Sequence, residues 1–142
     1  MPKKIPVKYY QAVGRRKLAV ARVRLYIIDK SGAINVNGVS IKKGEIVVNK
    51  KHVKADDYLE PLRLTENDQR FAISVSVKGG GKNGQIEAII HGLSRAIEKV
   101  DKDKYRNILK KAGLLKRDPR VKERRKVGRG GKARRKKQSP KR

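Results

Sequence analysis

Apolar and polar residues alternate along two stretches of the chain, and this alternation predicts two long β-strands. In residues 18–28 one face carries small and aliphatic side chains, whereas the other carries Arg22 and Arg24. In residues 71–77 large apolar groups occupy the odd positions and Ala or Ser the even ones. A period of two residues places such side chains on opposite faces of a sheet. Each strand should therefore bury one face, and the two arginines should face either solvent or phosphate.

Shorter apolar runs predict further strands. Residues 9–13 are typical of a strand that ends in a turn or bulge at 14–17, where three positive charges follow a glycine. Residues 33–36 and 39–41 flank Asn37-Gly38. This dipeptide favours a tight hairpin, because type I′ turns need positive φ at both central residues.

Residues 42–62 carry weaker patterns. Residues 45–48 predict a short strand, and residues 55–59 predict one helical turn before Pro61. His52 lies among lysines, so we predict that it is a surface residue rather than a ligand or a base.

Residues 85–100 carry apolar side chains at the three-to-four spacing of an amphipathic helix, which follows a glycine-rich connection at 78–84. A file of small residues, Ala88, Gly92 and Ala96, runs beside the apolar stripe. Gly92 costs about 1 kcal/mol relative to alanine inside a helix. The file therefore indicates close packing on a sheet or, alternatively, a close approach to a nucleic-acid backbone.

A final helix is predicted after Asp101 or Asp103, either of which can cap its start, and Gly113 suits the left-handed position at its end. Tyr105, Ile108, Leu109 and Ala112 repeat at the helical spacing i, i+3, i+4 and i+7. Leu114 and Leu115 should fold back onto the core.

The hydrophobic pattern ends at Leu115. Residues 116–142 hold fifteen Lys or Arg among 27 positions, with two acids and three apolar side chains. Such a segment cannot bury enough surface to offset its own ordering entropy. We therefore divide the chain into a globular domain at 1–115, which includes an irregular basic lead at 1–8, and an extended basic C-terminal tail at 116–142.

The charge of the whole chain points to a polyanionic partner. The formal net charge is +27, and residues 1–115 contribute 25 basic and 11 acidic side chains to it. The phosphate backbone of nucleic acid is the commonest partner for charge of this density. A solvated tail that only aids solubility is the alternative, although blocks of like charge are more often interaction arms.

Composition also excludes several classes of function. The chain has no cysteine, which excludes disulfides and thiolate chemistry. His91 is expected to be a hydrogen-bonded surface residue, and no nucleophile–base pair stands out. No apolar run approaches the roughly 18–20 residues of a membrane span, and no signal peptide precedes the first polar residues. We expect a soluble, intracellular protein without catalytic residues, cofactor, metal or membrane contact.

The glycine-rich connection at 78–84 allows two interpretations. A strand, three glycines and a helix start offer exposed N–H groups to an anion. The spacing matches neither a Walker loop nor the dinucleotide-binding fingerprint. The connection is therefore either a phosphate cradle, in which Lys78 and Lys82 suit a polymer backbone, or a plain strand-to-helix link.

Four segments resemble the motifs of the small-subunit ribosomal protein nine (S-nine) family, and they occur in the order of that family. They are GRRKLAVARV at 14–23, GGGKNGQIEAIIHGLSRAI at 79–97, KKAGLLKRDPR at 110–120 and KARR at 132–135. The end of the chain differs from bacterial-type relatives, because Gln138-Ser139-Pro140-Lys141-Arg142 lacks their aromatic residue.

The resemblance implies an α+β fold similar to the second domain of ribosomal protein S-five. Such a domain has a four-stranded sheet with two helices on one face, here followed by an extended disordered basic C-terminal tail. The implied function is that of a non-enzymatic structural constituent of the small ribosomal subunit in the cytoplasm, which is not a homo-oligomer. The implied partners are small-subunit ribosomal RNA of the head, neighbouring head proteins and the peptidyl-site transfer RNA, which the tail reaches during translation.

The resemblance and the charge together assign binding residues. Lys141 and Arg142 at the tip are expected to contact transfer RNA. The residues expected to bind ribosomal RNA are Arg15, Arg16, Lys17, Lys78, Lys82, Arg95, Arg117, Arg120, Lys122, Arg124, Arg125, Lys126, Arg129, Lys132, Arg134, Arg135, Lys136 and Lys137.

Two other functions remain open at this point. A small phosphate-handling enzyme is one, because metabolite kinases share this fold type and use a glycine-rich loop, although the chain is short for a nucleotide pocket and a lid. A DNA-compacting protein is the other, and it would explain the tail but not the helix motif at 79–97.

Overall fold

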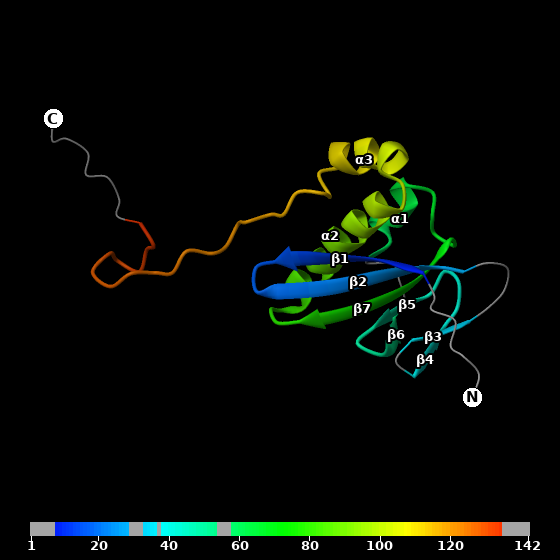
Figure 1. Ribbon diagram of the computed structural model, residues 1–142. Helices are drawn as coiled ribbons and strands as arrows, with labels where there is room; N and C mark the ends of the chain where they lie inside the picture. The colour runs from blue at the N-terminus through cyan, green and yellow to red at the C-terminus, as the bar shows by residue number, and fades with distance from the viewer. Residues whose placement is uncertain (1–7, 29–32, 37, 54–57, 135–142) are drawn as a thin grey trace.

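The computed structural model describes residues 8–28, 33–36, 38–53 and 58–134, and its fold is α+β (Figure 1). Seven strands and three helices form in this part of the chain. The strands are β1 Tyr9–Arg16, β2 Ala19–Ile27, β3 Ile34–Val36, β4 Val39–Ile41, β5 Ile46–Val48, β6 Lys51–Val53 and β7 Phe71–Lys78. The helices are α1 Glu60–Leu64, α2 Lys82–Val100 and α3 Lys102–Lys111.

Five strands form one mixed sheet in the order β1-β2-β7-β5-β6. β5 runs parallel to β7, and the other neighbours pair antiparallel. The sheet has five strands rather than the expected four, because the three-residue strand β6 extends it. β3 and β4 form a separate hairpin, as the Asn37-Gly38 pair predicts, with Gly38 at φ 83°; Asn37 itself lies outside the described residues.

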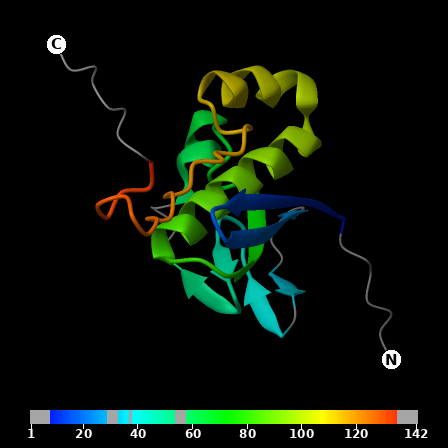
Figure 2. The ribbon, with the colours of Figure 1, turned by 90° about the vertical axis from the view of Figure 1, so that its left-hand side faces the viewer.

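The sheet forms a middle layer, with the helices on one face and the β3–β4 hairpin on the other (Figures 1 and 2). The main core lies between the sheet and all three helices, which include α1 in addition to the two expected. A smaller cluster lies under the hairpin, where Tyr26, Ile41, Val47 and Ala72 are buried. The two faces of β2 and β7 alternate as predicted over most of their length.

The predicted turn at 14–17 is wrong in its position. β1 continues through Arg16, and the chain turns at Lys17, whose φ is 49°. Glycine is needed at position 14 for tertiary packing instead of for a turn, because a Cβ there would lie 1.9 Å from the carbonyl oxygen of Ala88 in α2. A Cβ on Gly92 would lie 2.7 Å from Val23. Close packing of α2 on the sheet therefore explains the small-residue file, and Gly92 is buried away from any nucleic-acid backbone.

Two helices begin at residues other than those predicted. α2 starts at Lys82, three residues early, with Gly81 as its N-cap. α1 contains Pro61 in its first turn, where proline's missing N–H costs nothing. The sequence predicted a helical turn before this proline, and residues 55–57 of that turn lie outside the described residues.

α3 agrees with its predicted signals except on its exposed face. The Asp101 carboxylate accepts a hydrogen bond from the Lys104 N–H at 3.1 Å, and Gly113 adopts φ 74°. Of the four residues in its apolar repeat, Tyr105 and Leu109 are buried, whereas Ile108 and Ala112 are exposed. Leu114 and Leu115 pack partly buried against the main core, as predicted.

Candidate nucleic-acid interface

β1 is an edge strand, and side chains of α2 satisfy its outward backbone groups. The Lys99 ammonium donates to the Gln11 carbonyl oxygen at 2.7 Å, and the Arg95 guanidinium donates to the Val13 carbonyl oxygen at 2.6 Å. His91, Arg95 and Lys99 recur every four residues and so share one helix face. This arrangement covers the sheet edge and holds a line of cationic groups beside it.

A groove of about 420 Å³ opens next to this edge. Its charged lining consists of Arg15, Arg95 and Arg117, from β1, α2 and the segment after α3. No acidic side chain lines it. Arg95 uses one N–H on the Val13 carbonyl, which orients its guanidinium and leaves further donors for a ligand. Three guanidinium groups in one open groove suit the oxygens of a phosphate backbone.

His91 lies at the floor of this groove and joins β1 to the start of the tail. Its Nδ1 atom accepts a hydrogen bond from the Arg15 N–H at 3.2 Å, so its Nε2–H must donate to the Leu115 carbonyl oxygen at 3.3 Å. Burial lowers the pKa of His91 most, the nearby Arg95 charge lowers it further, and the Leu115 carbonyl opposes both. The ring is therefore neutral at pH 7 and serves as a structural link, which agrees with the predicted hydrogen-bonded histidine.

A second link fixes the start of the tail. Arg16 is only 8% exposed and forms an ion pair with Glu87 of α2. Its guanidinium also lies 3.3 Å from the Asp118 carboxylate and donates to the Arg120 carbonyl oxygen at 2.5 Å. We call residues 114–120 the root of the arm and residues 121–134 the outer arm. The root is held on β1 and α2 by His91 and Arg16.

Asp118 also organises the root locally. Its carboxylate accepts hydrogen bonds from the Arg120 N–H at 2.9 Å and from the Arg120 guanidinium at 2.7–3.0 Å. These bonds to Arg120, assisted by the charge of Arg16, hold the pKa of Asp118 well below its usual range. The carboxylate is therefore ionised at any pH near neutral, and it keeps its bonds to Arg120 and its contact with Arg16 there.

Among the described residues, the hydrogen bonds and ion pairs of the outer arm join only residues of the outer arm itself. It contains no helix or strand, and each of its side chains except Ala133 is exposed. Glu123 pairs with Arg134, and the Lys126 N–H donates to the Lys132 carbonyl oxygen at 3.1 Å. These contacts close a loop whose three glycines, at 128, 130 and 131, all have positive φ. Figure 1 shows this loop extending away from the domain.

The remaining basic residues assigned to the domain gather at the β1–β2 turn. Lys17 lies in that turn, Lys78 ends β7 opposite Val20, and Lys82 begins α2. Gly79 and Gly80 pack on the turn, since a Cβ on Gly79 would lie 2.6 Å from the Leu18 carbonyl oxygen and one on Gly80 would lie 3.0 Å from Ala19. Close packing and positive φ thus explain Gly79 and Gly80 without a ligand.

The structure brings some predicted binding residues together and leaves others apart. Arg15, Arg95 and Arg117 share the groove, whereas Arg16 faces inward. The exposed outer arm carries a further set, which consists of Lys122, Arg124, Arg125, Lys126, Arg129, Lys132 and Arg134. Arg135, Lys136, Lys137, Lys141 and Arg142 lie outside the described residues.

Sequence reasoning missed the acidic and neutral partners of this surface. Glu87 orients Arg16, Asp118 receives it, and His91, predicted only as a hydrogen-bonded residue, bonds to the Leu115 carbonyl, whereas binding residues were assigned by positive charge alone. One signal was present in the sequence, because Asp118 is one of only two acids in the tail. An isolated acid in a basic segment indicates an internal ion pair.

Other kinds of site find little support in the described part of the chain. Residues 8–28, 33–36, 38–53 and 58–134 contain no group of three or more His, Cys, Asp or Glu able to hold a metal ion. Within the same ranges no helix has the length and apolar character needed to cross a membrane. His52 is exposed on β6, with its Nδ1 atom 3.6 Å from Glu45, as predicted for a surface residue.

Comparison with known proteins identifies the family. The family model described as "Ribosomal protein S9/S16" matches residues 14–142. The "Small ribosomal subunit protein uS9" of Maridesulfovibrio salexigens is 48% identical over 120 residues, which cover 84% of this chain and 87% of that protein. These matches confirm the resemblance that four sequence segments indicated. The chain belongs to the ribosomal protein S9/S16 family.

Proposed function

We propose that this protein is a structural constituent of the small ribosomal subunit that binds ribosomal RNA of the subunit head in the cytoplasm. Its family is one of structural, non-enzymatic proteins. The arginine groove of Arg15, Arg95 and Arg117 is the observation that carries the proposal, because it places three guanidinium groups beside the root of a basic arm. Such contacts to phosphate position a protein, and RNA shape supplies specificity.

The arm provides the second part of the interface. The outer arm and the residues after it are basic and cannot fold alone, so they become ordered on RNA. A 27-residue tail spans at most about 90 Å at roughly 3.3–3.6 Å per residue. This reach supports contact of Lys141 and Arg142 with the peptidyl-site transfer RNA, although the aromatic residue of bacterial-type relatives is absent.

Each part of the chain has its own function in this proposal. Residues 1–115 act as the globular RNA-binding domain and residues 116–142 as the arm, with the root as the joint between them. The mixed sheet with helices on one face supports a domain of the S-five second-domain type. Arg16 serves the joint rather than RNA, because its donors already face Glu87, Asp118 and the Arg120 carbonyl.

The arginine groove gives the direct test. Replacement of Arg15, Arg95 and Arg117 by Gln should lower the affinity of the full chain for a transcript of the small-subunit head RNA. The slope of log K against log salt concentration should fall by about two to three. The control replaces Lys42, Lys43 and Lys102, three exposed lysines outside the groove, and should change affinity much less. Equal loss in both variants would contradict a specific role for the groove.

The tip of the arm is tested separately. Removal of Lys141 and Arg142 should weaken retention of transfer RNA in the peptidyl site while small subunits still assemble. Loss of assembly would instead assign the tip to ribosomal RNA. Duplex DNA that outcompetes the head transcript for the full chain would contradict the proposal as a whole and favour DNA compaction.

A further inference from the structure

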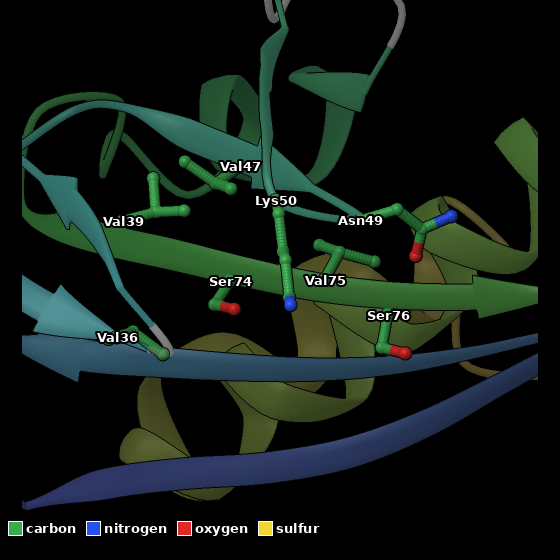
Figure 3. Close-up of a pocket in the computed structure, with 8 residues that line it drawn as sticks. All are labelled: Val36, Val39, Val47, Asn49, Lys50, Ser74, Val75 and Ser76. Atoms are coloured by element: carbon green, nitrogen blue, oxygen red, sulfur yellow. The ribbon is translucent and has the colours of Figure 1, made fainter.

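A second cleft lies on the sheet face away from the helices, beneath the β3–β4 hairpin (Figure 3). It has a volume of about 260 Å³. Val36, Val39 and Val47 provide apolar walls, and Ser74 and Ser76 of β7 provide a floor of small hydroxyl side chains. This cleft does not touch the arginine groove, which lies beyond the β1 edge.

The turn beside the cleft is strained. Asn49 and Lys50 connect β5 to β6, and their φ values are 47° and 68°. Two positive φ values are typical of a type I′ turn, in which glycine is favoured. Asn49 suits its position, because its side-chain amide both accepts from the Val77 N–H at 2.8 Å and donates to the Val77 carbonyl oxygen at 3.2 Å. Lys50 has no comparable bond among the described residues, so its strain calls for another cause.

The side chain of Lys50 extends over the cleft. Figure 3 shows it crossing β7, with its amino group above the floor near Ser74. Arg22 does not line the cleft, but it stands directly opposite Ser76 in the β2–β7 register and therefore shares the sheet face on which the floor lies. Both cations are exposed, and neither has an ion pair or a side-chain hydrogen bond within the described ranges. Arg24, the other arginine of this face, is already engaged with Gln11.

The chemistry of the cleft fits one class of ligand. Ammonium and guanidinium groups bind phosphate, hydroxyl groups bind sugar hydroxyls and base edges, and valine side chains pack against a base or a ribose. None of the described residues that line the cleft is acidic. The volume is below the roughly 300–1,000 Å³ typical of drug-sized ligands, which suits a single nucleotide unit.

We propose that the cleft under the β3–β4 hairpin binds one nucleotide of a single-stranded RNA segment. Lys50 and Arg22 hold its phosphate, and the base or sugar lies between Ser74, Ser76 and the valines. This inference rests on the proposed function, since it requires that the chain meets RNA. It adds a contact on the face of the sheet opposite the helices. The RNA would then contact the domain at two places, the arginine groove beside β1 and the cleft under the hairpin.

The variant Lys50→Gly distinguishes a phosphate-binding role of Lys50 from a structural one. Glycine removes the amino group and also relieves the positive φ, so the variant should melt at a higher temperature yet bind RNA more weakly. With the full chain and a single-stranded oligouridylate, affinity should fall several-fold and the salt slope should decrease by about one. Lys51→Gly is the matched control, because Lys51 is an exposed neighbour outside the cleft. It should leave the salt slope closer to that of the parent chain.

A second variant tests the cavity without changing charge. Ser74→Val fills the floor of the cleft and should weaken oligouridylate binding, while binding to duplex RNA stays the same because a duplex cannot enter. Normal oligouridylate binding by both Lys50→Gly and Ser74→Val would overturn the inference and leave a protein segment as the occupant. Equal losses for duplex and single strand would also overturn it.

The two proposals fail in different ways. If the head transcript does not bind the parent chain, or binds the groove variant normally, the proposed function fails. If the transcript binds through the groove and only the cleft variants behave like the parent chain, the further inference alone fails.

Discussion

The root of the arm and the outer arm are both basic, but the domain holds only the root. In the root, Arg16 and His91 reach Asp118, the Arg120 carbonyl and the Leu115 carbonyl. In the outer arm, Glu123 pairs with Arg134, and within the described residues this pair reaches no group of the domain. The placement of acids and backbone acceptors, rather than the density of positive charge, decides which part of a basic segment is fixed before RNA arrives.

This difference has a functional consequence under the proposed function. A root fixed on β1 and α2 sets the direction in which the arm leaves the domain. Ordering of the arm on RNA then starts from a defined position, which reduces the conformational entropy lost on binding. The outer arm keeps the freedom to follow the RNA surface.

The largest expected effect comes from forcing apart β1 and α2, the two elements on which the root is held. Gly14→Ala would place a Cβ 1.9 Å from the Ala88 carbonyl oxygen and force β1 away from α2. We expect the free energy of unfolding to fall by about 3 kcal/mol or more, measured by urea denaturation. Gly128→Ala in the outer arm is the control, because nothing lies within 4 Å of its added Cβ. Its φ of 74° disfavours alanine, but that strain falls on the outer-arm loop and not on the domain, so the unfolding free energy of the domain should stay close to that of the parent chain.

Removal of the buried Arg16 guanidinium should have the next largest effect on the free energy of unfolding. Arg16→Met leaves Glu87 and Asp118 without their shared partner. Since the Arg16 side chain is buried but both partners are partly exposed, we expect a loss of about 1–3 kcal/mol in unfolding free energy. Arg134→Met breaks the exposed pair of the outer arm and should leave unfolding unchanged. Equal effects of the two substitutions would remove the distinction between root and outer arm.

Acidification should loosen the root in two steps. The pKa of His91 is lowered in the folded state. Below about pH 6.5, His91 therefore binds a proton in the unfolded chain before it does so in the folded chain. The free energy of unfolding falls as the pH drops, until His91 of the folded chain is protonated as well. The pKa of folded Asp118 is also lowered, so its contribution is present above about pH 4 and is lost as pH falls further. Urea denaturation across this range measures both steps. In His91→Gln the upper step should disappear, whereas the lower step should remain.

The smallest effect on folding should accompany a clear effect on RNA binding. Arg134→Met changes no contact with the domain, but it removes one cation and the pair that closes the outer-arm loop. The salt slope for the head transcript should fall by about one without loss of folding. An unchanged slope would mean that this part of the arm does not contact phosphate.

Local patterns predicted much of the fold. The alternation in β7, the apolar stripe of α2 and the Asp101 cap all depend on residues within a few positions of one another, and all were found. The turn at 14–17 was misplaced because Gly14 is required by α2, which follows almost 70 residues later. β6 was missed because Lys51-His52-Val53 holds one apolar side chain only and is mostly exposed, so it shows no strand pattern.

The candidate site was likewise predicted in part, because its residues were identified from the sequence but their arrangement in space was not. Charge and motif identified Arg15, Arg95 and Arg117, but nothing in the sequence indicated that they share one groove. The link between Arg16 and Asp118 joins the first strand to the tail, and such a long-range pair leaves no local signal. The strain at Lys50 also depends on backbone geometry that its residue type does not favour.

Distance measurements between spin labels test most directly whether the root is fixed and the outer arm is not. The chain has no native cysteine, so a label can be placed at residue 43 and a second one at either residue 116 or residue 127. In the free protein the 43–116 distance distribution should be narrow and the 43–127 distribution broad, and Arg16→Met should broaden the first. Equally broad distributions in the parent chain would contradict a root held by the domain.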